Sequence, residues 1–309
     1  MSKISFLFSG QGSQKVGMGK NLCDINSNAK RVFECASDVL GFNLLKICCE
    51  SKPEELSKTK YSQPAIMAVS LAAFECLKET NIQPAAVAGH SLGEYAAMVA
   101  SNILSLEDGF RVIKARASAM QECSKKHNGS MCAVIGLEPS VIEQKCDEID
   151  GYVTCVNYNS PLQTVVAGET ESVKKLADNL KDIAKLCIFL KVNAAFHSKL
   201  MQPAVKPFLD EIESIKFSEP TIPFYSNLTG TKLSSDTNVK TTLGNHLTSP
   251  VRFTDELNSM KNDQIDTYIE LGPGKVLSGL VKKTLSDVKI LNVEDEQSLN
   301  KTLTYLNKN

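Results

Sequence analysis

The sequence predicts an α/β protein built on a mainly parallel sheet, with a smaller unit inserted into it. Short apolar runs alternate with segments of helical periodicity over residues 1–126 and again over 198–309. Between them the predicted order changes to strand, helix, strand, strand, helix, strand. The chain has 309 residues, of which 42% are hydrophobic, so it can bury one large core and one small one.

Two short apolar runs in the first part of the chain predict buried strands, ISFLF at 4–8 and AAVAG at 85–89. The Gly-rich turn SGQGSQ closes the first of them. Apolar residues at helical spacing predict helices around these strands. The predicted helices cover residues 28–49, 64–79, 92–101 and 107–122.

A polar loop, SKKHNGS at 124–130, marks the start of the inserted unit. The order of the elements that follow is that of a split-βαβ, ferredoxin-like unit. We therefore expect a large α/β domain of residues 1–126 and 198–309, and a small ferredoxin-like domain of residues 127–197. The predicted strands of the small domain cover 131–137, 152–158, 163–168 and 185–192, and its predicted helices cover 138–149 and 171–182.

The last part of the chain returns to alternating helices and strands. We predict a helix near 198–214, strands in IPFYSN at 222–227 and TYIELG at 267–272, and a helix starting at KVLSGLVKK, 275–283. This alternation is typical of a mainly parallel sheet.

Composition excludes several classes of protein. With 34 basic and 35 acidic side chains the net charge is -1, which gives no general attraction to nucleic acid or anionic membrane. The N-terminal MSKISFLFSGQGSQ has no signal-peptide core, and no apolar run approaches the roughly 18 residues of a membrane span. We expect a cytoplasmic monomer without nucleic-acid or membrane partners.

Ten cysteines are spread along the chain without a CxxC pair. Zinc sites and redox pairs need close, regular spacing, so no metal site is expected. The favoured interpretation is that these cysteines are small buried hydrophobes in a reducing compartment.

The segment GHSLG, 89–93, fits the pattern G-x-S-x-G of a nucleophile elbow. A short apolar strand precedes it and a helical run follows, which is the context this motif requires. Such a turn exposes Ser91 and points the N–H groups of the next helix at its oxygen. The alternative is a structural turn whose serine caps the helix.

A serine hydroxyl needs a base to become a good nucleophile, and the chain offers four histidines. His90 adjoins Ser91 and is expected to point to the opposite face of the strand end. His127 lies in a polar loop and His246 in a polar segment before a turn. His197 lies where the small domain returns to the large one, and clefts between domains are where substrates bind. His197 is therefore the preferred base, with a satisfied structural histidine as the alternative.

Five segments together resemble malonyl-CoA:acyl-carrier-protein transacylases and the acyltransferase domains of fatty-acid and polyketide synthases. The resemblance implies a hydrolase-like large domain with a small inserted subdomain, and it covers almost the whole chain. The segments are GQGSQ at 10–14, GHSLGEY at 89–95, AFHSKLM at 195–201, SPVRF at 249–253 and ELGPGKVLSGL at 270–280.

The resemblance implies a role for each matching residue. Ser91 is the expected nucleophile, and His197 is the expected general base and acid. Gln11 and Leu92 match the oxyanion-hole pair, Leu92 through its backbone N–H. The family orients its histidine with a backbone carbonyl rather than with an acidic side chain, and no acidic third partner is evident in this sequence.

Arg116, 25 residues after Ser91, matches the arginine that holds the malonyl carboxylate. A guanidinium binds a carboxylate through two hydrogen bonds and stays charged when buried. The chain has four arginines against thirty lysines, which favours a geometric reason for this one. The alternative is a cation on a helix surface.

The remaining positions implied by the resemblance surround the substrate. Phe196 resembles the malonyl-selecting residue of the polyketide branch, where a ring leaves no room for an α-methyl group. Asn159 and Gln163 match positions along the thioester and pantetheine path, with turn chemistry beside Pro161 as the alternative. His246 replaces the glutamine that many bacterial members carry four residues before the proline, so a side-chain role at this position is in doubt.

The resemblance implies transfer of malonyl from malonyl-CoA to the phosphopantetheine thiol of a transiently bound acyl-carrier protein, for fatty-acid synthesis and without a cofactor. An acyltransferase of a polyketide pathway is the first alternative. A serine thioesterase or lipase-like hydrolase fits the elbow but leaves Arg116 unexplained. A non-catalytic docking subunit would lack the serine or the histidine, and both are present.

Overall fold

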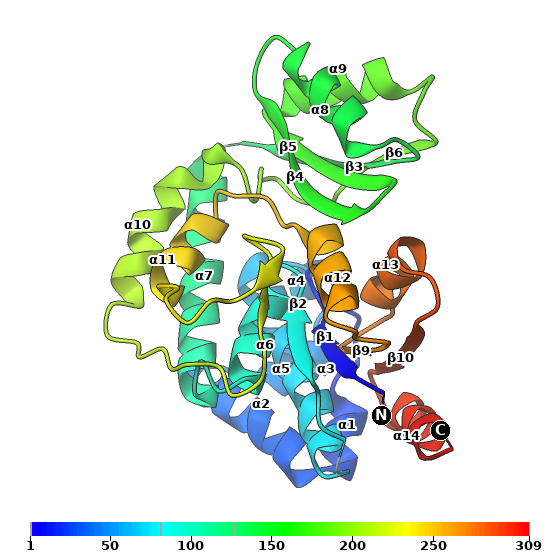
Figure 1. Ribbon diagram of the computed structural model, residues 1–309. Helices are drawn as coiled ribbons and strands as arrows, with labels where there is room; N and C mark the ends of the chain where they lie inside the picture. Colours follow the sequence, from blue (N-terminus) through cyan, green and yellow to red (C-terminus); the bar gives the residue numbers. More distant parts are fainter. Residues whose placement is uncertain (1, 81, 127, 309) are drawn as a thin grey trace.

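A parallel sheet of four strands forms the centre of the larger part of the molecule in the computed structural model (Figure 1). The structure describes residues 2–80, 82–126 and 128–308. The strand order is β10-β9-β1-β2, and every neighbouring pair is parallel, which confirms the predicted α/β class with a parallel sheet. The strands are β1 (Ile4–Phe8), β2 (Ala86–Gly89), β9 (Thr267–Leu271) and β10 (Lys289–Val293).

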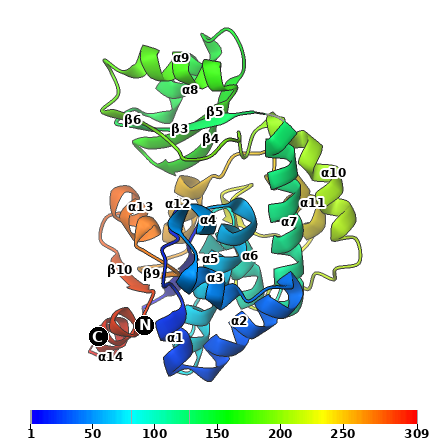
Figure 2. The same cartoon turned by 180° about the vertical axis from the view of Figure 1, so that it is seen from behind.

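Helices cover both faces of this sheet (Figures 1 and 2). Successive side chains of a strand point to opposite faces, so Phe6 and Phe8 pack into a core with α2, α5, α6 and α7, whereas Leu7 packs with α12 and α13. The helices of this part are α1 (Lys20–Ile25), α2 (Ser27–Leu40), α3 (Leu44–Glu50), α4 (Pro53–Leu56), α5 (Thr59–Lys78), α6 (Gly93–Ala100), α7 (Leu106–Lys126), α10 (Gln202–Glu211), α11 (Val239–His246), α12 (Phe253–Asn262), α13 (Val276–Thr284) and α14 (Glu296–Asn307), with a 3₁₀ turn at Lys199–Met201.

The helix predicted over 28–49 is two helices in the structure. Gly41 has φ 81° and ends α2 with a hydrogen bond from its N–H to the Ser37 carbonyl. Asn43 then starts α3, because its side chain accepts the N–H of Lys46. The apolar periodicity continues from α2 into α3, so it does not reveal where one helix ends and the next begins. The capping residues determine both positions.

The strand predicted over 222–227 is much shorter than expected. Within this range only β7 (Tyr225–Ser226) is paired as a strand, with β8 (Thr231–Lys232), although Phe224 also makes a single parallel bridge to Val87 of β2. The strand β10 and the helices α11, α12 and α14 were not predicted.

The smaller part contains an antiparallel sheet of order β4-β5-β3-β6, with α8 and α9 on its outer face (Figure 1). The predicted sequence of strand, helix, strand, strand, helix, strand is confirmed. The elements are β3 (Ser130–Ile135), α8 (Pro139–Asp147), β4 (Val153–Ser160), β5 (Gln163–Gly168), α9 (Thr170–Leu180) and β6 (Leu186–Phe189).

Backbone hydrogen bonds join the smaller part to the larger one. Val251 donates to the Val156 carbonyl at 2.8 Å and accepts from the Tyr158 N–H at 2.9 Å. The hydroxyl of Thr254, on α12, donates to the Tyr158 carbonyl at 3.0 Å. These hydrogen bonds fix strand β4 against the larger part. The strand carries Asn157 and Asn159, which are discussed with the candidate active site below.

The ten cysteines are free, and seven of them are buried. Burial raises the pKa of the Cys23 and Cys48 thiols to about 12, so neither is a nucleophile near neutral pH. Within the described ranges, no group of three or more His, Cys, Asp or Glu side chains is arranged to hold a metal ion.

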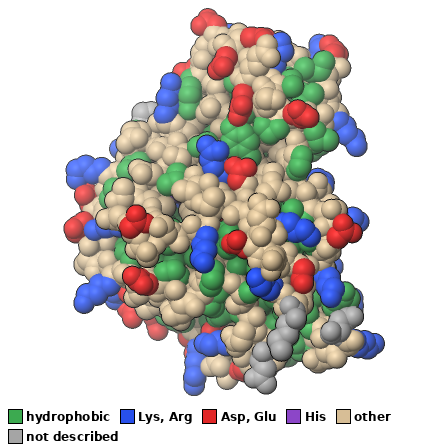
Figure 3. Space-filling view, in the orientation of Figure 1, with side chains coloured by type: hydrophobic (Ala, Val, Ile, Leu, Met, Phe, Trp, Pro, Cys, Tyr) green, Lys and Arg blue, Asp and Glu red, His purple; other side chains and the backbone are tan. Residues whose placement is uncertain are grey.

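Two surface properties bear on partners. No helix among the described residues has both the length and the apolar character needed to cross a membrane. Acidic and basic side chains are interspersed over the face shown in Figure 3, without a broad area of one sign.

Candidate active site

Ser91 lies on a sharp turn between the end of β2 and the start of α6. Its φ of 53° is left-handed, a strained conformation for a residue with a side chain. The flanking glycines are required by close backbone contacts: a Cβ on Gly89 would lie 2.0 Å from the carbonyl carbon of Gly93, and one on Gly93 would lie 2.1 Å from the Phe8 oxygen. The sequence pattern therefore forms the predicted elbow.

The Gly93→Ala substitution should lower the free energy of unfolding by about 2–4 kcal/mol, because a methyl group there must displace backbone of β1. Gly279→Ala is the matched control, since a Cβ at this position on α13 meets nothing within 4 Å. That control should be neutral or slightly stabilising. Urea unfolding monitored by circular dichroism measures both changes, and equal values for the two variants would contradict the packing argument.

The imidazole of His197 contacts the serine directly. Its Nε2 lies 2.7 Å from Ser91 Oγ, and its Nδ1 donates to the backbone carbonyl of His246 at 2.9 Å. Because Nδ1 carries the proton, Nε2 is free to accept one from the hydroxyl. Burial, together with the neighbouring His246 and Arg116, holds the pKa of His197 well below its usual range, so the ring is a neutral base near pH 7.

Arg116 reaches the same oxygen from α7. Its Nη2 donates to Ser91 Oγ at 3.0 Å, and its guanidinium lies 5.3 Å from the ring centroid of Tyr95. The side chain is only 1% exposed, its Nε has no hydrogen-bond partner, and no carboxylate of the described residues forms an ion pair with it. A buried cation without a counter-ion beside a nucleophile is a site for an anionic group of a substrate.

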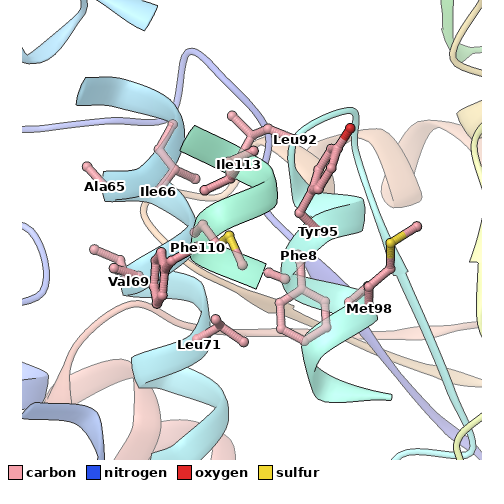
Figure 4. Close-up of a cluster of buried hydrophobic side chains, with 14 of the residues drawn as sticks. Phe8, Ala65, Ile66, Val69, Leu71, Leu92, Tyr95, Met98, Phe110 and Ile113 are labelled. Carbon is pink, nitrogen blue, oxygen red and sulfur yellow. The ribbon is translucent and has the colours of Figure 1, made fainter. Parts of the chain in front are cut away.

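Two backbone N–H groups near Ser91 remain available for an oxyanion. Leu92 is the N-cap of α6, and within the described part of the chain neither its N–H nor that of Gln11 donates a hydrogen bond. The Leu92 side chain is anchored in the same buried cluster as Ile66, Phe110 and Ile113 (Figure 4). This anchoring fixes the first N–H groups of the helix, where the helix dipole favours negative charge.

A cavity of about 350 Å³ opens over Ser91 and His197 at the junction of the two parts. Gln11 lines it from the larger part, and Asn157 lines it from the smaller one. Phe196 also lines it and is 7% exposed, so its ring limits the space beside the base.

Four of the predicted substrate residues are not among those that line this cavity: Arg116, which contacts Ser91 Oγ, and Asn159, Gln163 and His246. Asn159 Oδ1 accepts a hydrogen bond at 2.7 Å from Nε2 of His90, a residue that lines the cavity. Gln163, the first residue of β5, accepts from Lys283 Nζ at 3.0 Å. His246 lies beneath the base, with its side chain facing Glu94.

The ring of His90 lies 5.4 Å from that of Phe253, in the cluster around Leu7, whereas Ser91 Oγ contacts His197. Both residues also line the cavity. His127 lies outside the described residues.

Asn157 was missed by the sequence analysis. It lines the cavity and is 8% exposed, and its Oδ1 has no hydrogen-bond partner among the residues that the structure describes. An asparagine inside an apolar strand was the available signal. Register shifts on either side of it in the β4–β5 pairing made its facing unpredictable from alternation.

A buried polar network supports the elbow from behind, and sequence analysis did not find it. Asn227 Oδ1 accepts the N–H of Ser91 at 2.6 Å, and Asn227 Nδ2 donates to the Gly89 carbonyl at 2.6 Å. The Asn227 N–H in turn donates to Glu94 at 2.7 Å, and its Nδ2 also donates to Glu256 at 2.8 Å. Asn227 therefore ties the serine turn to two buried carboxyl groups.

An elbow serine in contact with an imidazole, on a parallel α/β sheet, defines the class of serine-dependent acyl-transfer enzymes. Comparison with known proteins narrows this class. Residues 5–303 match the model of the acyl transferase domain, and the chain belongs to the acyl transferase domain family.

Relatives from bacteria match over nearly the full length. The chain is 37% identical over 303 residues to malonyl CoA-acyl carrier protein transacylase of Bacillus subtilis, covering 97% of this chain and 96% of that protein. The crystal structure of malonyl CoA-acyl carrier protein transacylase from Clostridium perfringens superposes with a TM-score of 0.95 at 36% identity, covering 99% and 98%. A malonyl-transacylase in complex with its type II PKS acyl-carrier protein superposes with a TM-score of 0.94 at 34% identity, covering 98% and 100%.

Proposed function

We propose that this protein transfers a malonyl group from malonyl-CoA to the phosphopantetheine thiol of acyl-carrier protein, through a malonyl ester of Ser91, and so supplies fatty-acid synthesis. The observation that carries the proposal is the guanidinium of Arg116, which is buried, has no counter-ion within the described ranges and lies 3.0 Å from the Ser91 oxygen. The malonyl carboxylate supplies the missing anion. The activities named for the relatives agree with this substrate.

In the first half-reaction, Ser91 Oγ attacks the thioester carbonyl carbon while its proton moves to His197 Nε2. The carbonyl oxygen gains negative charge, which the N–H groups of Leu92 and Gln11 stabilise. The C–S bond then breaks, and the protonated His197 gives its proton to the sulfur of the departing CoA. The malonyl carboxylate stays on Arg116, which orients the acyl group.

The second half-reaction reverses these steps with a different thiol. His197 takes the proton of the phosphopantetheine thiol, the sulfur attacks the ester carbon, and Ser91 regains its proton as the C–O bond breaks. One thioester is exchanged for another, so the equilibrium constant is near one. Hydrolysis of the malonyl-serine ester would release the acyl group as free malonate, and the exchange reaction could not recover it. The cavity must therefore keep water away from this ester.

The position of the cavity suggests how the partner approaches. It opens between the larger part and the smaller part, which we take to be a hydrolase-like domain of residues 1–126 and 198–309 and a ferredoxin-like domain of residues 127–197. The acyl-carrier protein is proposed to insert its phosphopantetheine there, transiently, without any further cofactor. We propose a cytoplasmic monomer.

An acceptor in a polyketide pathway is the second candidate, because one structural neighbour is a complex with a type II PKS acyl-carrier protein. Transfer rates to fatty-acid and polyketide carrier proteins, measured side by side, separate the two. The faster acceptor identifies the pathway.

Mass spectrometry of the intact protein tests the central proposal. Brief mixing with malonyl-CoA should add one malonyl group, and holo acyl-carrier protein should then remove it with formation of malonyl-carrier. The apo carrier protein, which lacks the thiol, is the control. Free malonate accumulating without any carrier would instead mean that water is the acceptor and that the protein is a thioesterase.

A further inference from the structure

One buried asparagine has every polar atom of its side chain engaged at the nucleophile turn. Asn227 is 0% exposed, and its Oδ1 accepts the Ser91 N–H at 2.6 Å. Its Nδ2 donates to the Gly89 carbonyl at 2.6 Å and to Glu256 Oε1 at 2.8 Å. One donor and two acceptors therefore surround the amide, and they determine which of its ends is oxygen and which is nitrogen.

We propose that Asn227 is a positioning residue for the reaction, whose side-chain amide holds Ser91 in the left-handed conformation that directs its Oγ to His197 Nε2. Asn227 acts through the backbone of Ser91, since its amide bonds the N–H of that residue and not the hydroxyl. The inference rests on the proposed function in one respect, namely that Ser91 is the nucleophile.

The backbone of Ser91 needs this support because it is strained. Its φ of 53° is a conformation that persists in a residue with a side chain only where the surrounding structure imposes it. Asn227 bonds both peptide groups that precede Ser91, one through the Gly89 carbonyl and the other through the Ser91 N–H. Two successive peptide planes are thereby fixed, and with them the direction in which the Ser91 side chain leaves the turn.

The fold holds Asn227 from two sides. Phe224 makes a parallel bridge to Val87 of β2, so the segment that leads to Asn227 runs alongside the strand that ends at the elbow. From the start of α12, the N–H of Arg252 donates to the Asn227 carbonyl at 2.9 Å. The neighbour of β2 and the start of α12 therefore present the amide to the turn.

Glu256, also on α12, keeps the amide from rotating. Its side chain is fully buried, and burial together with the nearby Glu94 raises the pKa of its carboxyl well above the usual range. The carboxyl is therefore neutral near pH 7 and accepts from Asn227 without placing a charge of its own behind the serine. Glu94 instead accepts the backbone N–H of Asn227 at 2.7 Å, which leaves the side-chain amide to the turn.

The same hydrogen bond bears on the proposed oxyanion site. Because the Ser91 N–H is bonded to Asn227, it is not available to the thioester oxygen. The next N–H along the chain, that of Leu92 at the start of α6, is then the donor that the turn offers. Asn227 thereby divides the work of the elbow: one N–H holds the turn and the next serves the reaction.

Loss of the amide should slow the chemistry without weakening substrate binding. A displacement of about 1 Å at the reacting atoms can cost about 10²-fold in rate. Both half-reactions use Ser91 Oγ with His197, so acylation and transfer to the carrier protein should slow by the same factor. Arg116, the proposed partner of the malonyl carboxylate, is held separately on α7. KM should therefore be unchanged, and malonyl and acetyl transfer should lose equally.

The experiment compares Asn227→Leu with Asn227→Asp. Leucine has a similar volume and removes every hydrogen bond of the side chain, so the rate constant for acyl-enzyme formation should fall about 10- to 100-fold. Aspartate keeps an oxygen for the Ser91 N–H but has no amide hydrogens for Gly89 and Glu256, so its rate constant should be intermediate. Asn43→Ala is the matched control, because that asparagine caps α3 instead of contacting the elbow, and its rate constant should be unchanged.

The rate and the stoichiometry of adduct formation separate positioning from a purely structural role. A variant that only destabilises the fold lowers the fraction of chains that accept a malonyl group. A misplaced serine instead slows acylation but still reaches one malonyl group per chain. Unchanged rate constants in the Asn227 variants would overturn the inference, and so would a loss confined to malonyl. If Asn227→Leu does not fold, the rate constant of Asn227→Asp decides.

A second reagent keeps the test independent of the proposed function. Phenylmethylsulfonyl fluoride sulfonylates an activated serine with release of fluoride, and it needs no thioester, carboxylate site or carrier protein. Its reaction with Ser91, followed by intact mass, should slow in Asn227→Leu by the same factor as acylation, and equal labelling rates would contradict the positioning role. A wild-type protein that accepts the sulfonyl group but no malonyl would overturn the proposed function, while slower labelling of the variant would still support the inference.

Discussion

The Ser91→Ala variant should form no malonyl adduct and should transfer malonyl at least about 10⁴-fold more slowly than the wild-type protein. The reason is that the reaction has no covalent intermediate without the Ser91 oxygen. The neighbouring groups cannot replace it, because His197 and Arg116 both direct their hydrogen bonds at that oxygen. Intact mass after brief mixing with malonyl-CoA measures the adduct, and carrier-protein loading measures the rate.

Ser118→Ala is the matched control for this variant. Ser118 is an exposed serine on α7, the helix that carries Arg116. Ser118→Ala removes a serine Oγ, as Ser91→Ala does, but at a position outside the candidate active site. The malonyl adduct and the transfer rate should therefore be unchanged. An adduct that survives in Ser91→Ala would show that another group accepts the malonyl, and the elbow would then be a structural turn.

The elbow could be predicted from the sequence because its determinants are local. A short apolar strand, two glycines and a helical run are contiguous, and their order alone dictates a tight turn that exposes Ser91. The order of elements in the smaller part was predictable for the same reason, since strand and helix periodicities differ. The break at Gly41 was not predicted, because an apolar stripe continued across it.

The support of the elbow could not be predicted, because it depends on contacts across the chain. Asn227 is 136 residues from Ser91 in sequence, and nothing in its local surroundings distinguishes it from other asparagines in turns. The contact between Glu94 and His246 likewise needs two helix ends to meet. Motif resemblance supplied roles at matched positions, and it pointed to no role for Asn157, which lines the cavity.

The Arg116→Ala variant should lose about 10²- to 10³-fold in malonyl transfer and less than about tenfold in acetyl transfer. The carboxylate of malonyl would be buried beside Ser91 without a partner, and an unpaired buried charge costs several kcal/mol. Acetyl carries no such charge, so it loses only the influence of the guanidinium on the Ser91 oxygen. Rates for both acyl-CoA substrates, measured with the same carrier protein, give the ratio that matters.

Arg111→Ala provides the matched control, because Arg111 lies on the same helix but is exposed and paired with Glu107 and Asp108. It should change neither rate. Arg116→Lys separates charge from shape: an ammonium keeps the charge but loses the planar fork, so malonyl transfer should fall to an intermediate level.

Equal losses for malonyl and acetyl in Arg116→Ala would mean that the arginine serves the serine alone. Selectivity between acyl groups would then have to come from the space that Phe196 leaves in the cavity. A pocket discriminates one small substituent by no more than about 1–3 kcal/mol of transition-state binding free energy. The ratio of the two losses therefore decides whether charge or space selects the substrate.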